Sequence, residues 1–335
     1  MADFTPSHIS PPAQWLRRLA LAGVLLAFVV VVLGAYVRLS AAGLGCPDWP
    51  GCYGHATPIG AHASAAATRI DLGKAWREMI HRYAALTLVL IIVLIAALAI
   101  AMRRSRLVPT ALPIALFAIV VVQAALGMLT VTWQLTPLIV TLHLLFGMTT
   151  LALLWWLALS LRIRPVLIPP EPPRAAQFVL LALVALIVQI ALGGWTSSNY
   201  AAIACPDLPT CRGSFWPAAD FRDAFVLWHP LSVNYEGGVL SDPARIAIHF
   251  THRLGAIVAT IALLGAAWAV LKRPTLRYAH GLAGFVVLAL ALQLTIGASM
   301  VLRGFPLALA TAHNAGAALT LLAVLALLHR LRTHA

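Results

Sequence analysis

Apolar residues gather into eight long blocks along the chain, separated by shorter polar connections. Each block reaches the roughly 20 residues that a helix needs to cross the hydrocarbon core of a bilayer. The blocks are Leu16–Val37, His81–Met102, Pro109–Thr132, Leu138–Leu161, Ala175–Trp195, Ile246–Leu271, Ala279–Val301 and Pro306–His329. The pattern therefore predicts an all-α integral membrane protein with eight transmembrane helices.

The composition agrees with this prediction. Of the 335 residues, 61% are hydrophobic and only 10% are charged, and the mean hydropathy is +0.92. A soluble domain of this size could not cover its surface with so few charges.

The distribution of charge predicts how the helices are oriented. The formal net charge of +13 would suit nucleic acid, but the excess lies almost wholly on one face. The two termini and the connections after the second, fourth and sixth blocks carry 13 Lys and Arg against two acidic residues, whereas the other connections carry 10 against eight. This is the positive-inside pattern of a multi-pass protein of the cell inner (plasma) membrane with both termini cytoplasmic. We expect the bilayer as its partner and no nucleic acid.

The chain also repeats itself. Cys46-Pro-Asp-Trp-Pro-Gly-Cys52 returns as Cys205-Pro-Asp-Leu-Pro-Thr-Cys211, and His81-Arg82 returns as His252-Arg253. Gln123 precedes His143 by 20 residues, as Gln293 precedes His313, and Gly34, Gly127, Gly193 and Gly297 match in the same way. We predict two tandem four-helix bundles, residues 1–168 and 169–335, joined near the Pro-rich segment Pro165–Pro173. Copies with an even number of helices share one orientation, so a pseudo-two-fold axis is expected along the membrane normal.

Four histidines recur at matched positions of the two copies. His81 and His252 are expected to begin the second and sixth helices, and His143 and His313 lie early in the fourth and eighth, all toward the outer side. Two imidazoles from facing helices suit the axial ligation of a heme iron. A packed core histidine is the plainer interpretation of any one of them, but not of two matched pairs. Zinc is disfavoured because no carboxylate or thiolate stands at ligand spacing on these helices.

Other polar residues near these histidines have two interpretations each. Gln123 and Gln293 would support a ligand or bridge helices. Arg82 and Arg253 would contact heme propionates, or else snorkel to the interface. His329, near the C-terminus, is expected to face solvent.

The copies differ three residues before the first histidine of each pair, where Glu78 stands in one and His249 in the other. A spacing of three residues puts Glu78 on the face of His81. A carboxylate beside one site only would move protons or stabilise positive charge. The alternative is an acid favoured at a helix N-terminus.

All four cysteines, Cys46, Cys52, Cys205 and Cys211, fall on the predicted outer face, an oxidising setting. We expect each close pair to form a disulfide that holds its loop. A redox role for Cys46–Cys52 is an open alternative.

Three features together resemble heme A synthase over nearly the whole chain: Ala42-Gly-Leu-Gly-Cys46-Pro-Asp-Trp-Pro-Gly-Cys52, Glu78-Met-Ile-His81-Arg82 and the repeated histidines. The resemblance implies oxidation of the C8 methyl of heme O to the formyl group of heme A, for terminal oxidase biogenesis. It implies that His252 and His313 ligate a heme b cofactor, that His81 and His143 bind the substrate heme O, and that Glu78 is catalytic. Heme O synthase and terminal oxidase assembly factors are the expected partners, and the electron donor is not indicated.

Two other functions fit parts of the pattern. A diheme b-type membrane cytochrome would pass electrons from quinol without modifying heme, which explains the histidines but not the difference between Glu78 and His249. A heme transporter fits the repeated helices, but it would not need paired ligands.

Overall fold

The computed structural model describes residues 11–62, 71–105, 110–161, 174–228, 230–231 and 233–333. Within them, eight helices are long and apolar enough to cross a membrane, which confirms the predicted count and the all-α class. They are α1 (Pro11–Leu39), α3 (Leu72–Ala101), α4 (Ala111–Thr132), α5 (Pro137–Ser160), α6 (Arg174–Ser198), α8 (Asp242–Leu271), α9 (Arg277–Leu302) and α10 (Leu307–Thr333). The short helices α2 (Pro58–His62) and α7 (Phe221–Ala224) and the 3₁₀ turns η2 (Arg103–Ser105), η3 (Ala202–Ala204) and η4 (Pro274–Leu276) lie between them. The predicted linker Pro165–Pro173 lies outside the described residues.

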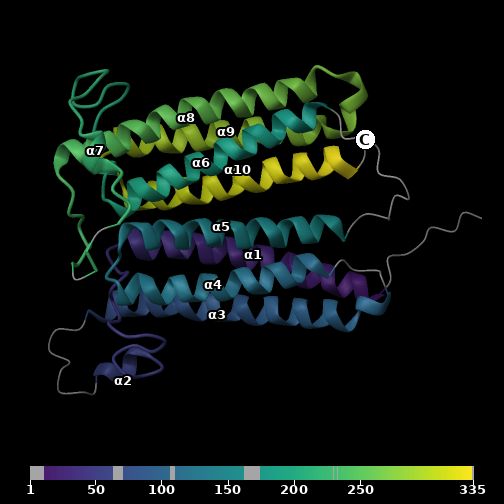
Figure 1. The fold of residues 1–335 in the computed structure, drawn as a ribbon, viewed down its shortest axis with the longest axis horizontal. Coiled ribbons are helices and arrows are strands. Elements are labelled where there is room, and N and C mark those ends of the chain that lie inside the picture. The colour runs from purple at the N-terminus through teal and green to yellow at the C-terminus, as the bar shows by residue number, and fades with distance from the viewer. Residues whose placement is uncertain are drawn as a thin grey trace, which may run out of the picture.

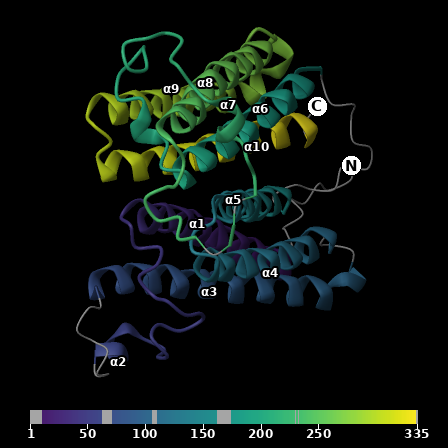
Figure 2. The same cartoon turned by 60° about the vertical axis from the view of Figure 1, so that its left-hand side comes forward.

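The eight helices form two groups of four (Figures 1 and 2). In the first half α1 packs on α3, α3 on α4, α4 on α5 and α5 on α1. In the second half α6, α8, α9 and α10 close a ring in the same order. The halves meet through α1, α5, α6 and α10, with α1 against α10 and α5 against α6. These two contacts exchange corresponding helices, as a two-fold relation would, although the axis itself remains a prediction.

Two predicted helix starts are wrong. His81 and His252 do not begin their helices, because α3 begins at Leu72 and α8 at Asp242. The first turns of both helices carry charged side chains, so hydropathy alone places the helix start too late. In α3 the carboxylate of Asp71 caps the N-terminus by accepting a hydrogen bond from the Lys74 amide at 3.0 Å. His81 therefore lies about 14 Å along its helix, at 1.5 Å per residue.

The contact between the halves also corrects the expectation for His329. Its side chain is only 5% exposed, with Nε2 3.3 Å from the Ser160 hydroxyl and its ring edge-on to Trp156 at 4.9 Å. It is buried because α10 lies on the face of the second bundle that packs against the first, so that α5 covers α10 almost to its C-terminal end. Nearby, the indole N–H of Trp155 donates to the carbonyl of Leu322 across the same interface at 3.0 Å.

The loop between α7 and α8 crosses from the second half to the first, as the thread descending from α7 toward α5 shows in Figure 2. The Tyr235 amide donates to the Gln134 carbonyl at 3.0 Å, and the Tyr235 side chain is 1% exposed. Trp228 packs edge-on against Trp133 at 5.9 Å. This loop includes the extra residues that distinguish the second copy, and it ties together the ends of the two bundles that carry the disulfides.

Candidate functional site

The four repeated histidines lie toward one end of the bundles, the end that carries the disulfide loops. His81 and His143 enter the first bundle from α3 and α5, and His252 and His313 enter the second from α8 and α10. His81 lies near His143, and His252 lies near His313. The structure thus brings together each pair that the repeat predicted.

Each of these imidazoles lies against a glycine of a neighbouring helix. An ideal Cβ built on the glycine would lie 2.9–3.2 Å from Cε1 of the histidine, so any larger residue would push the ring away. The pairs are Gly34 with His81, Gly127 with His143, Gly193 with His252, and Gly297 with His313. Every helix of a bundle therefore contributes either a histidine or the glycine that makes room for it. The sequence marked these glycines only as repeated positions.

Glutamine amides lie beside three of the histidines. Gln293 Nε2 is 3.3 Å from Nε2 of His313, which confirms the expected contact with a candidate ligand. Gln123 lies against Gly147, one turn beyond His143. The third amide, Gln189 on α6, was missed because it does not repeat. The signal that could have found it is a lone amide inside an apolar helix, one turn before Gly193.

The donor set fits a porphyrin iron. The Nδ1 atoms of His81, His143 and His313 are buried without a hydrogen-bond partner in the described chain, and such groups normally have a ligand or partner. Within the same residues, no three His, Cys, Asp or Glu side chains gather as a metal site. Two imidazoles without further protein ligands suit a metal that brings its own equatorial ligands, as a heme does.

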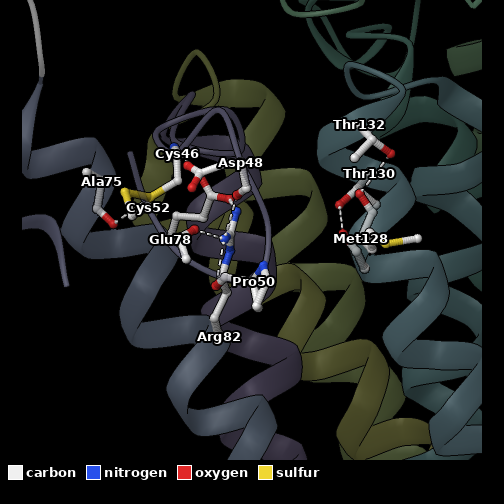
Figure 3. Close-up of polar contacts among 12 residues, drawn as sticks. Cys46, Asp48, Pro50, Cys52, Ala75, Glu78, Arg82, Met128, Thr130 and Thr132 are labelled. Carbon is white, nitrogen blue, oxygen red and sulfur yellow. Dashed lines mark hydrogen bonds and ion pairs between the residues drawn. A yellow bond between two sulfur atoms is a disulfide. The ribbon is translucent and has the colours of Figure 1, made fainter. Parts of the chain in front are cut away.

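Glu78 is tied to the disulfide loop rather than free beside His81. It is 4% exposed, and its Oε2 accepts a hydrogen bond from the Cys46 amide at 2.8 Å. Its Oε1 pairs with Arg82, one turn further along α3. Figure 3 shows the carboxylate between the arginine and the loop. A buried carboxylate that is paired and hydrogen-bonded is held in a fixed position, so Glu78 links the loop to the helix of His81.

Both arginines hold a disulfide loop. Arg82 Nη1 donates to the carbonyls of Asp48 at 2.9 Å and Gly51 at 2.6 Å. Arg253 donates to the carbonyls of Thr210 at 2.7 Å and Cys205 at 2.9 Å. Contacts with propionates stay a prediction for both, and the contacts that the structure shows are with the loop backbone.

The second copy replaces the acid with an imidazole. His249 is 4% exposed, and Arg253 Nε donates to its Nε2 at 3.3 Å. The loop of the first half is thus held through a carboxylate, and the equivalent contact in the second half carries no negative charge. This electrostatic difference between the copies is the clearest one at the candidate sites.

Both predicted disulfides are present, Cys46–Cys52 and Cys205–Cys211. In each loop an aspartate accepts two backbone amides: Asp48 from Tyr53 and Gly54, and Asp207 from Arg212 and Gly213. The Thr210 hydroxyl is the largest of the contacts that lower the pKa of Asp207 to about 2, followed by the Gly213 and Arg212 amides. A depressed pKa stabilises the fold above the usual aspartate pKa of 3.8, and this contribution is lost as the pH falls from there through about 2.

We expect native protein to show no reactive thiol. All four cysteines are at most 2% exposed, so burial alone would block labelling of the folded protein. The measurement should therefore follow denaturation without reductant, with a reduced and denatured sample as the control. The chain has four cysteines, all of them paired, so labelling before reduction would contradict the disulfides.

Comparison with known proteins gives a consistent set of matches. The profile of the family described as "Cytochrome oxidase assembly protein" matches residues 17–325. The chain is 43% identical over 318 residues to the heme A synthase of Shewanella oneidensis, covering 92% of this chain and 93% of the relative. It is 27% identical over 347 residues to the heme A synthase of Rhizorhabdus wittichii, covering 96% and 95%. A third relative, the heme A synthase of Methylobacterium radiotolerans, is 34% identical over 197 residues and covers 58% and 50%.

Proposed function

This chain belongs to the family of cytochrome oxidase assembly proteins that includes heme A synthase, and we propose that its two bundles divide that enzyme's work between substrate and cofactor. The protein is a heme A synthase, an oxidoreductase that oxidises the C8 methyl of heme O to the formyl group of heme A. In this proposal the first half, residues 1–168, holds heme O, and the second half, residues 169–335, holds heme b.

One observation carries the proposal: there are two equivalent imidazole pairs, and only the first has a buried carboxylate, Glu78, three residues before one of its histidines on the same helix. His81 and His143 would bind the iron of heme O, and His252 and His313 would ligate heme b. Within each half the paired histidines come from different helices and lie near each other. The glycine opposite each ring leaves space for the imidazole where a Cβ would intrude.

The histidines, Glu78 and Arg82 of the first half would each have a separate role in the oxidation. His81 and His143 would orient the porphyrin so that the C8 methyl faces one position in the bundle. Conversion of a methyl to a formyl group adds an oxygen atom to that carbon and removes electrons and protons from it, and Glu78 would accept a proton or stabilise positive charge there. Arg82 holds Glu78 through their ion pair. When bound, heme b would supply one-electron redox chemistry.

The surroundings of the enzyme follow from charge and chemistry. The eight spans make it a multi-pass membrane protein. We place it in the plasma membrane with both termini cytoplasmic and both heme sites toward the outer side, as the excess of Lys and Arg at the termini favours. Heme O is apolar enough to reach the site from the bilayer, and heme O synthase and oxidase assembly factors are the proposed partners.

The decisive experiment is co-expression with a source of heme O, followed by extraction of the hemes and mass analysis. We expect heme A to accumulate only when the chain is present. A diheme cytochrome or a transporter would leave heme O unchanged, so recovery of unmodified heme O alone would refute the proposal.

A further inference from the structure

Gln189 makes a contact with His252 that no other histidine of the repeat shares in the same form. Its Nε2 is 3.1 Å from Nδ1 of His252 and donates to the carbonyl of the same residue at 3.0 Å. The amide therefore holds both the ring and the backbone of one candidate heme ligand. When iron binds Nε2 of His252, its Nδ1 carries the proton, and Gln189 can accept from it by turning its amide so that Oε1, which has no hydrogen-bond partner in the described chain, faces the ring.

A second residue, Gly255, makes room for the Gln189 amide. An ideal Cβ at Gly255 would collide with Oε1 of Gln189, so a larger residue there would displace the amide from its place between α6 and α8. The Gln189 amide thus fits the space that Gly255 leaves on the facing helix, and it contacts His252 in a defined geometry.

His81, the counterpart of His252 in the first half, lacks this arrangement. By the repeat, Val30 corresponds to Gln189 and Ala84 to Gly255. The Nδ1 atoms of His81, His143 and His313 have no hydrogen-bond partner in the described part of the chain, whereas Nδ1 of His252 meets Gln189. Amides lie near both histidines of the second half, whereas in the first half only His143 has one nearby. His81 is therefore the least restrained of the four.

We propose that Gln189 is a positioning residue that makes the second site a permanent one, and that its absence beside His81 lets the first site exchange its porphyrin. A partner on the outer nitrogen of a metal-bound histidine fixes the ring and raises its basicity, and losing such a partner costs about 10–100-fold in metal affinity. An enzyme whose substrate and cofactor are both hemes needs one site that releases and one that retains. This inference rests on the proposed assignment of heme b to the second half.

The test compares Gln189→Leu with its parent for the rate of heme transfer to excess apomyoglobin. A His143→Ala background confines the bound heme to the second site. We expect release to be about tenfold faster in the Leu variant and the midpoint potential of its heme to rise, because a less basic imidazole stabilises ferric iron less. Gln189→Glu keeps an oxygen acceptor of the same length for the ring and loses the donor to the His252 carbonyl, so it should release heme more slowly than Gln189→Leu.

A second test does not depend on how well Gln189→Leu folds, because it introduces the amide and its facing glycine into the first half. Val30→Gln combined with Ala84→Gly should slow the release of heme O from the first half of otherwise unmodified protein. Equal release rates and potentials in Gln189→Leu and its parent, or no slowing in the graft, would overturn the role of this amide. If the parent itself retains no heme in its second half, it is the proposed function that fails.

Discussion

Replacing Glu78 with Gln is expected to lower heme A formation at least about 100-fold, the lower end of what a positioned acid or base contributes, while both heme sites stay filled. The physical reason is that Gln keeps the length and an oxygen acceptor for the Cys46 amide but loses the negative charge that pairs with Arg82. The measurement is the ratio of heme A to heme O in extracts, alongside the absorbance of the bound heme.

Two further variants separate chemistry from loop anchoring. Glu78→Ala removes both the charge and the acceptor, so it should lose activity and also loosen the loop around Cys46. His249→Ala removes the equivalent contact of the second half, and it should leave far more activity than Glu78→Gln does. A normal heme A yield from Glu78→Gln would show that Glu78 has a structural role only.

The second large effect is expected at His313. His313→Ala should remove the low-spin heme signal of the second half, and with it heme A formation, because a bis-imidazole site loses one of its two ligands. An unchanged absorbance spectrum in this variant would contradict the assignment of His313 as a ligand.

A substitution at Gly297 should also reduce heme binding in the second half, and it leaves His313 itself unchanged. A Cβ at Gly297 would lie 2.9 Å from Cε1 of His313, so Gly297→Ala must displace the ring from its position. We expect heme occupancy of the second half to fall about tenfold or more, within the range for disturbed support of a metal ligand. Gly284→Ala is the matched control, because Gly284 lies on the same helix and a Cβ added there would meet no atom within 4 Å. Equal loss of heme in both variants would mean that helix stability, and not the room beside His313, is responsible.

The two candidate sites share one structural feature, a connection between the histidine's helix and a disulfide loop. In each half an arginine that directly follows a histidine holds the backbone of a disulfide loop. The loop, the arginine and the histidine are therefore connected, and a displacement of the loop would shift the helix that carries the candidate ligand. In the first half this unit also contains Glu78, which places a buried charge between the disulfide and the candidate substrate site.

Some predictions needed no tertiary structure. The eight spans followed from hydropathy, because a bilayer sets a minimum length for an apolar helix. The repeated histidines, Glu78 and the cysteine pairs followed from internal repetition, which aligns equivalent residues without any knowledge of packing. The starts predicted for α3 and α8, at His81 and His252, were wrong for a related reason. Hydropathy marks where the apolar part of a helix begins, and both helices begin earlier, in residues that carry charged side chains.

The contacts across helices were decided only by the fold. That each imidazole lies on a glycine, that Glu78 is held by the Cys46 amide, and that Gln189 meets His252 all depend on how helices rotate and cross. His329 is buried for the same reason, because α10 lies where the second bundle packs against the first. Periodicity fixes which residues share a face of one helix, but the neighbour that a face meets is set by packing between segments distant in the chain, and that information is present only in three dimensions.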